Sequence, residues 1–85
     1  MSGMSRADAD AFLRSLSATL KTTAGGYAEY KFPDKSAVWI RLDGEVVRTP
    51  APTYRPDGSR TNKGGRLDPN GNPTTEHNTG EKLNI

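Results

Sequence analysis

The most informative segment of the chain is Ala37-Val-Trp-Ile-Arg-Leu-Asp-Gly-Glu-Val-Val-Arg-Thr49. Two runs rich in β-branched and aromatic residues flank Asp43-Gly44, a dipeptide that signals a β-hairpin with a two-residue type I′ turn. Such a turn would fix three cross-strand pairs: Leu42 with Glu45, Ile40 with Val47, and Trp39 with Arg48. The stretch therefore predicts the central hairpin of an antiparallel sheet.

An earlier strand is predicted at residues 27–32. It would join the hairpin through residues 33–36, where Pro33 suits the second position of a β-turn. This connection sets two further pairs: Phe32 with Ala37, and Tyr30 with Trp39. We therefore expect a sheet of three or four strands, with its central part over residues 27–49.

Side chains alternate between the two faces of a strand, so the pairing also assigns the faces. The face expected to pack on a helix carries Val38, Ile40, Leu42 and Val47. The opposite face would interleave aromatic and basic side chains: Tyr30, Phe32, Trp39, Arg41, Val46 and Arg48. A shift of one residue in the register would exchange these faces.

Residues 5–23 are predicted to form a helix. Ser5 is a favourable N-cap, and Asp8 three residues later completes a variant of the capping box. Apolar residues recur at helical spacing: Ala9, Phe12, Leu13, Leu16 and Leu20. Gly25-Gly26 would then end the element. The predicted fold class is α+β, with one N-terminal helix packed on a small antiparallel sheet.

The chain of 85 residues is predicted to be a single domain with a small core, because only 32% of its residues are hydrophobic and its mean hydropathy is −0.80. Residues 50–85 hold five of the six prolines and few apolar side chains. We expect this part to be a long polar, turn-rich segment without a core of its own. A short strand is expected either between the turns at residues 54–60 and 67–72 or around Arg66-Leu67.

Composition also narrows the function classes. The chain has no cysteine and one histidine, which argues against thiol catalysis, a thiolate zinc site or a His-rich metal site. We expect no cofactor, and recruitment of a metal stays open. No run of residues is apolar enough to span a membrane, and residues 1–11 do not read as a signal peptide. The net charge of +2 permits an anionic partner. We expect a monomer that does not bind membranes.

Cations dominate residues 41–66, where six of them stand against three acidic residues, a net charge of +3. The guanidinium fork of arginine matches phosphate oxygens, and aromatic side chains can stack on unpaired bases. The residues expected to bind RNA are Trp39, Arg41, Tyr54, Arg55, Arg60 and Arg66. The alternative is an ordinary solvated surface.

Residues 61–66, Thr-Asn-Lys-Gly-Gly-Arg, could let the backbone approach a phosphate closely. They lack the spacing of a P-loop, and no helix pattern follows them. A loop that contacts phosphate and a plain turn are both open interpretations.

His77 is the single candidate for proton transfer by an imidazole. RNA cleavage without a metal needs a base for the 2′-hydroxyl, an acid for the leaving 5′-oxygen, and cations on the phosphate. His77 could take one proton role, and Glu81 or Glu76 the other. The groups expected to stabilise the phosphate are Lys63, Arg48 or Arg66, with a hydrogen bond from Thr79 or Asn78. A histidine in a polar segment can equally have no catalytic role.

Four segments between Tyr30 and Glu81 together resemble the C-terminal toxin domains of bacterial polymorphic toxins, the contact-dependent and Rhs-type effectors. The likeness lies in four motifs: Val38-Trp-Ile-Arg-Leu-Asp-Gly-Glu-Val-Val-Arg-Thr-Pro50, Tyr54-x-Pro-Asp-Gly58, Asn62-Lys-Gly-Gly-Arg-Leu-Asp-Pro-Asn-Gly-Asn72 and His77-Asn-Thr-Gly-Glu81. The chain is also loosely similar to the ribosome-cutting colicins. Their catalytic Asp-His-Glu cluster precedes the strands, where this chain has no histidine, so those residues are not carried over.

The resemblance implies a metal-independent endoribonuclease that cuts tRNA or rRNA in the cytoplasm of a rival cell, delivered there as part of a secreted effector. It also implies a cognate immunity protein, acidic enough to cover a basic cleft. Two other interpretations stay open. One is a non-catalytic module that binds RNA or DNA through the basic aromatic face, and the other is a protein-interaction module whose polar segment orders on its partner.

Overall fold

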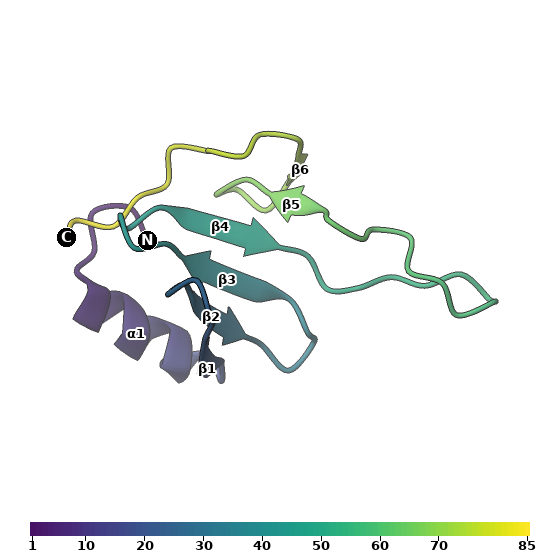
Figure 1. The fold of residues 1–85 in the computed structure, drawn as a ribbon, viewed down its shortest axis with the longest axis horizontal. Helices are drawn as coiled ribbons and strands as arrows, with labels where there is room; N and C mark the ends of the chain where they lie inside the picture. Colours follow the sequence, from purple (N-terminus) through teal and green to yellow (C-terminus); the bar gives the residue numbers. More distant parts are fainter.

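The computed structural model describes residues 1–85 and consists of one helix and a six-stranded antiparallel sheet (Figure 1). The elements follow in the order α1 (Arg6–Ser15), β1 (Thr19–Thr22), β2 (Ala28–Lys31), β3 (Ala37–Ile40), β4 (Val46–Thr49), β5 (Arg66–Leu67) and β6 (Pro73–Thr74). Each strand pairs with the next one along the chain. The α+β class and the N-terminal helix are confirmed, whereas the sheet has six strands and not three or four.

The core lies between α1 and one face of the sheet. Its buried members are Ala9 and Leu13 from α1, Ala18, four sheet residues (Tyr30, Val38, Ile40, Val46), and Leu83 near the C-terminus. Residues 50–85 contribute two short strands, β5 and β6, to the sheet and one side chain, Leu83, to the core. No helix of the chain is long and apolar enough to cross a membrane.

The helix begins as predicted but ends eight residues early. Ser5 caps it by accepting a hydrogen bond from the backbone N–H of Asp8 at 3.1 Å. At the other end Ser17 takes a left-handed φ of 68°, which closes the last turn. The Thr-rich residues that follow form β1 instead, since β-branched side chains favour strands. The prediction of helix over residues 16–23 was wrong.

The hairpin between β3 and β4 has a three-residue loop, not a two-residue turn. The N–H of Arg41 donates to the carbonyl of Glu45, and the N–H of Gly44 donates to the carbonyl of Arg41, both at 2.9 Å. Gly44 occupies the left-handed position that such a loop requires, with φ of 88°. The observed pairs are Ile40 with Val46, Trp39 with Val47, and Val38 with Arg48. The predicted register was wrong by one residue.

The β2–β3 connection repeats this geometry. Phe32 and Ser36 close a three-residue loop in which Lys35 has φ of 70°. The resulting pairs are Lys31 with Ala37, Tyr30 with Val38, and Glu29 with Trp39. The two predicted pairs of this hairpin were therefore also wrong.

The corrected registers redistribute the side chains. Tyr30, Val46 and Arg48, expected on the open face, lie on the core side of the sheet, and Val47 lies on the open side. Leu42 sits in the loop and is exposed rather than buried. Val38 and Ile40 are in the core, and Trp39 and Arg41 are on the open face, as predicted.

Five turns of the chain share one hydrogen-bond pattern, although no repeat was predicted. In each five-residue turn, the backbone N–H of the first residue donates to the carbonyl of the fifth, and the N–H of the fourth donates to the carbonyl of the first. The fourth residue has a left-handed φ. They span Thr23–Tyr27, Phe32–Ser36, Arg41–Glu45, Arg55–Ser59 and Asp68–Asn72. The sheet is thus an up-and-down meander whose fourth turn lies at the tip of an arm, residues 50–65, that projects from the sheet (Figure 1).

Candidate nucleic-acid interface

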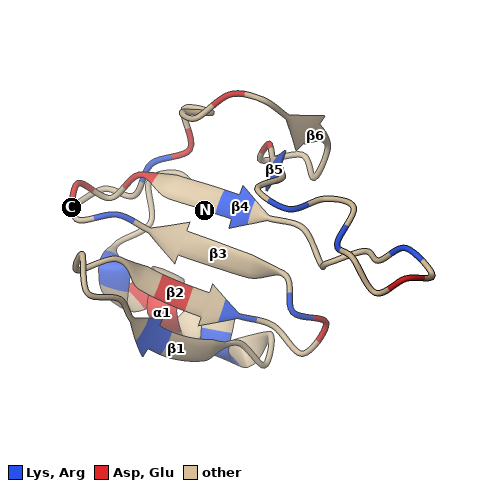
Figure 2. Cartoon of the chain, turned by 45° about the vertical axis from the view of Figure 1, so that its right-hand side comes forward, with Lys and Arg blue, Asp and Glu red and all other residues tan.

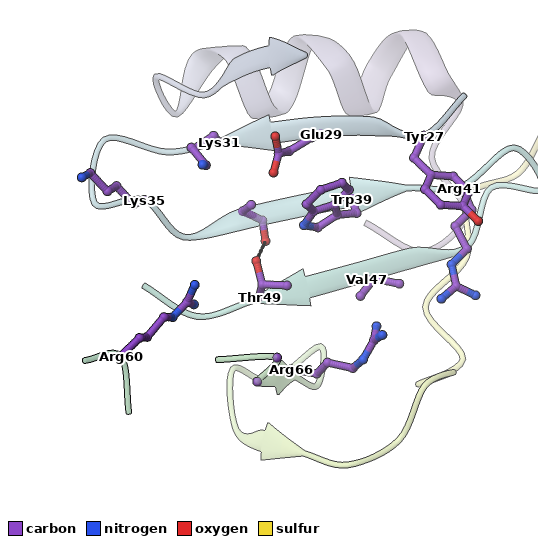
Figure 3. Close-up of a pocket in the computed structure, with 13 residues that line it drawn as sticks. Tyr27, Glu29, Lys31, Lys35, Trp39, Arg41, Val47, Thr49, Arg60 and Arg66 are labelled. Atoms are coloured by element: carbon purple, nitrogen blue, oxygen red, sulfur yellow. Dashed lines mark hydrogen bonds between the residues drawn. The ribbon is translucent and has the colours of Figure 1, made fainter. Parts of the chain in front are cut away.

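The face of the sheet opposite α1 carries a groove of about 400 Å³, here called the aromatic groove (Figure 3). Its charged and aromatic lining comprises Trp39, Tyr27, one acid (Glu29) and five cations: Lys31, Lys35, Arg41, Arg60 and Arg66. Trp39 lies between Glu29 on β2 and Val47 on β4, its two partners in the ladder. An aromatic ring surrounded by cations can stack a base and contact the phosphates beside it.

The loop before β5 closes one side of the aromatic groove. The Asn62 side chain organises it, since its Oδ1 accepts hydrogen bonds from Arg60 Nε at 2.9 Å and from the Thr53 N–H at 3.1 Å. A Cβ at Gly65 would lie 3.0 Å from the Asn62 carbonyl oxygen and 3.3 Å from Pro50 Cγ. A side chain at residue 65 would therefore crowd the Asn62 carbonyl and Pro50, whereas glycine lets this loop pack closely.

The cations of the aromatic groove are largely free to bind an anion. Arg41 forms an ion pair with Glu45 at 3.2 Å, whereas Lys31, Lys35, Arg60 and Arg66 have no acidic partner within 4.0 Å. Figure 2 shows further basic positions along the arm. Four uncompensated cations around one ring create a local positive potential that favours phosphate.

A second groove, of about 340 Å³ and lined only by polar residues and glycines, adjoins the first. This histidine groove brings His77 together with Lys63, Arg66 and the hydroxyl-bearing Thr74 and Thr75. The two grooves share Gly64, Gly65 and Arg66. The structure thus gathers three of the sequence-predicted residues, His77, Lys63 and Arg66, in the histidine groove.

Arg48 and Glu81 lie elsewhere, as an ion pair on the core side of the sheet. Arg48 Nε and Nη2 donate to the two carboxylate oxygens of Glu81, each at 2.8 Å, and the Met1 ammonium lies 3.3 Å from the same carboxylate. Burial disfavours ionisation of Glu81, but Arg48 and the ammonium outweigh it and lower its pKa. Neither residue lines the grooves, so the predicted catalytic constellation is not assembled around His77.

The remaining sequence-predicted residues lie outside both grooves. Thr79 is half-buried and lines neither of them. Tyr54 and Arg55 belong to the arm, where Tyr54 is exposed and pairs with Arg60 in an isolated bridge. Of the residues predicted to bind RNA, four line the aromatic groove: Trp39, Arg41, Arg60 and Arg66.

Four groove residues were missed from the sequence: Tyr27, Glu29, Lys31 and Lys35. Glu29 and Lys31 alternate with the buried Tyr30 on β2, so they share the face of Trp39 only in the observed register. A three-residue loop at Pro33-Asp34-Lys35 was the signal that could have placed them.

The chain contains no group of three or more His, Cys, Asp or Glu side chains positioned to hold a metal ion. No protein-family model matches the chain, and no curated protein or solved structure matches it either.

Proposed function

We propose that this chain is a metal-independent endoribonuclease of the bacterial toxin type, which holds single-stranded RNA in the aromatic groove and cuts it in the histidine groove. The observation that carries the proposal is that Gly64, Gly65 and Arg66 line both grooves. In this proposal a nucleotide stacked at Trp39 has its neighbouring phosphate at Arg66, the one charged residue that lines both grooves.

Binding in this proposal combines stacking and charge. An unpaired base stacks on Trp39, and Lys31, Lys35, Arg60 and Arg66 contact the backbone phosphates. Single-stranded nucleic acids are held in this way on sheet surfaces, because every base offers an aromatic face and every phosphate a charge. A paired base in a duplex could not reach the ring, so the substrate segment is a loop or an unpaired end of tRNA or rRNA.

Cleavage in this proposal uses the 2′-hydroxyl of the RNA itself. The 2′-oxygen bonds to phosphorus and the bond to the 5′-oxygen breaks, which yields a 2′,3′-cyclic phosphate and a free 5′-hydroxyl. His77 accepts the proton of the 2′-hydroxyl, and the Lys63 ammonium donates one to the leaving oxygen. Arg66 stabilises the negative charge that develops on the phosphate. Glu81 has no part in this assignment, because Arg48 occupies its carboxylate.

The resemblance to polymorphic toxin domains adds the biological setting. A ribonuclease of this kind would act in the cytoplasm of a rival cell after delivery by a larger effector. An acidic immunity protein would protect the producer by covering the cationic grooves, and opposite charges would speed its capture.

The proposal is tested by incubating the purified chain with total bacterial RNA in EDTA, beside its His77→Ala variant, on a denaturing gel. We expect discrete fragments from the parent that carry 2′,3′-cyclic phosphate ends, and intact RNA from the variant. RNA left intact by the folded parent, both in EDTA and with magnesium, would contradict it.

A non-catalytic RNA-binding module is the second candidate. It is favoured by the exposure of His77 and by the absence of any hydrogen bond from the protein that orients its ring. In that case the aromatic groove binds RNA, and the His77→Ala variant binds it as tightly as the parent does, but neither protein cuts it.

A further inference from the structure

We infer that Glu29 makes the aromatic groove selective for guanine. The inference rests on the proposed binding of RNA in that groove and adds the identity of the base. Glu29 is directly opposite Trp39 in the β2–β3 ladder, and Figure 3 shows it beside the ring.

The position of Glu29 is unfavourable for a groove that binds only phosphate. It is the single acid among five cations in the lining, and its charge repels the phosphates that those cations attract. The residue is half-buried, and its carboxylate accepts no hydrogen bond from the protein and forms no ion pair within 4.0 Å. Both oxygens are therefore available to a ligand.

The chemistry of the bases decides what such a carboxylate accepts. A base stacked on Trp39 leaves its Watson–Crick edge open to hydrogen bonds, and the inference places this edge toward Glu29 on the neighbouring strand. Guanine has two adjacent donors on this edge, N1–H and the N2 amino group, which match the two oxygens of a carboxylate. Lys31 is on the same strand and the same face as Glu29, where its ammonium can donate to O6 of guanine.

The other three bases place an acceptor where the carboxylate needs a donor. Adenine and cytosine each have one amino group beside a ring nitrogen that accepts, and uracil has one N–H between two carbonyl oxygens. Each would bring a lone pair against Glu29. A bidentate contact of this kind is worth about 1–3 kcal/mol of discrimination, which corresponds to roughly 5- to 150-fold in affinity.

The competing explanation is charge balance. Lys21 lies opposite Glu29 on β1, and Lys31 follows it on β2, so the carboxylate could merely lessen the repulsion between lysines. The two explanations differ in their consequences. Removal of a base-reading carboxylate abolishes the preference for one base, whereas removal of a balancing charge raises the affinity for all oligonucleotides equally.

The test uses four fluorescein-labelled 2′-O-methyl oligonucleotides, UUUXUUU with X as G, A, C or U, which lack the attacking hydroxyl and cannot be cut by the proposed route. Affinity is measured by fluorescence anisotropy for the parent, Glu29→Gln and Glu29→Ala, with circular dichroism to confirm folding. Asp8→Asn, which removes one negative charge on α1 away from the grooves, is the matched control.

We expect the parent and Asp8→Asn to bind the G oligonucleotide at least 5-fold more tightly than the other three, and both Glu29 variants to lose this preference for G. A parent that binds all four equally, with a uniform gain of affinity in the Glu29 variants, overturns the guanine inference and leaves RNA binding intact. Failure of the folded parent to bind any of them, together with failure to bind total tRNA, overturns the proposed function as well.

Discussion

Arg48 on β4 donates through Nε and Nη2 to both carboxylate oxygens of Glu81, and so ties the sheet to a segment 33 residues further along the chain. The Glu81 side chain is 2% exposed and the Arg48 side chain 28%. Loss of one partner of a buried pair leaves the other charge without compensation.

Arg48→Met is therefore expected to lower the free energy of unfolding by about 3 kcal/mol, the lower end of the range for a broken buried pair. Urea unfolding at pH 7, followed by the fluorescence of Trp39, measures it. The double variant Arg48→Met with Glu81→Gln should recover part of this loss, because no unpaired carboxylate then stays buried. An Arg48→Met variant as stable as the parent would show that the pair does not hold the segment.

Acid should destabilise the fold through the same carboxylate. The folded state holds the pKa of Glu81 below its ordinary value, because the hydrogen bonds and charge of Arg48 outweigh the effect of burial. The unfolded chain then binds its proton first, so the stabilisation is present above about pH 4.3, the ordinary pKa of glutamate, and is lost as the pH falls through the folded pKa. Unfolding midpoints between pH 3 and 7 should fall less steeply for Glu81→Gln than for the parent, and parallel curves would argue against this role.

Trp39 should carry most of the stacking energy of the interface. Trp39→Ala is expected to weaken the binding of single-stranded RNA by about 1–3 kcal/mol, whereas Trp39→Phe retains most of the affinity because it keeps a ring. Anisotropy of a labelled oligonucleotide measures the change. Phe12→Ala, which removes an exposed aromatic side chain from α1, is the control and should bind like the parent. Equal RNA affinity of Trp39→Ala and the parent would show that RNA does not bind on the open face of the sheet.

The salt dependence of RNA binding should reveal how many phosphates the protein contacts. For single strands, log K falls against log salt concentration with a slope of about −0.7 for each phosphate contacted. If Lys31, Lys35, Arg60 and Arg66 each contact one phosphate, the slope should be close to −3, and Arg66→Gln should reduce its magnitude by about 0.7. Lys82→Gln removes a cation outside both grooves and should leave the slope unchanged. A parent affinity independent of salt would exclude a phosphate ligand.

Much of the architecture could be predicted from local patterns. The cap at Ser5, the α+β class and the runs that became β2, β3 and β4 were evident from residue types, and Arg66-Leu67 was one of two positions expected for a short strand. The face of Trp39 and Arg41 was also correct, because β3 alternates clearly between apolar and polar side chains.

The register of β4 could not be taken from Asp43-Gly44 alone. The dipeptide fits a two-residue type I′ turn and equally a three-residue loop with glycine at its left-handed position, and the choice shifts the next strand by one residue. Three other turns of the chain indicate which loop forms. Pro33, Pro56 and Pro69 each begin a loop of the same kind, and proline cannot take the positive φ of a type I′ turn. This shared pattern favours the longer loop throughout the chain.

The candidate site was only partly predictable for a different reason. Arg48 and Glu81 are of the residue types that ribonuclease chemistry requires, but their pairing depends on contacts between distant segments. In contrast, Lys63, Arg66 and His77 come together because β5 and β6 form a tight hairpin that carries the flanking residues along. All five residues could be proposed from their types, but only Lys63, Arg66 and His77 lie together in the structure.

The most direct test of the account measures binding and cutting separately on total bacterial tRNA in EDTA, for the parent, His77→Ala and Trp39→Ala. The two-groove account predicts that His77→Ala binds tRNA with the parent's affinity and does not cut it. It also predicts that Trp39→Ala binds at least 5-fold more weakly and cuts at a rate that recovers as the tRNA concentration rises. Cleavage by His77→Ala at the parent's rate would contradict the account, because the histidine groove would then not be where RNA is cut.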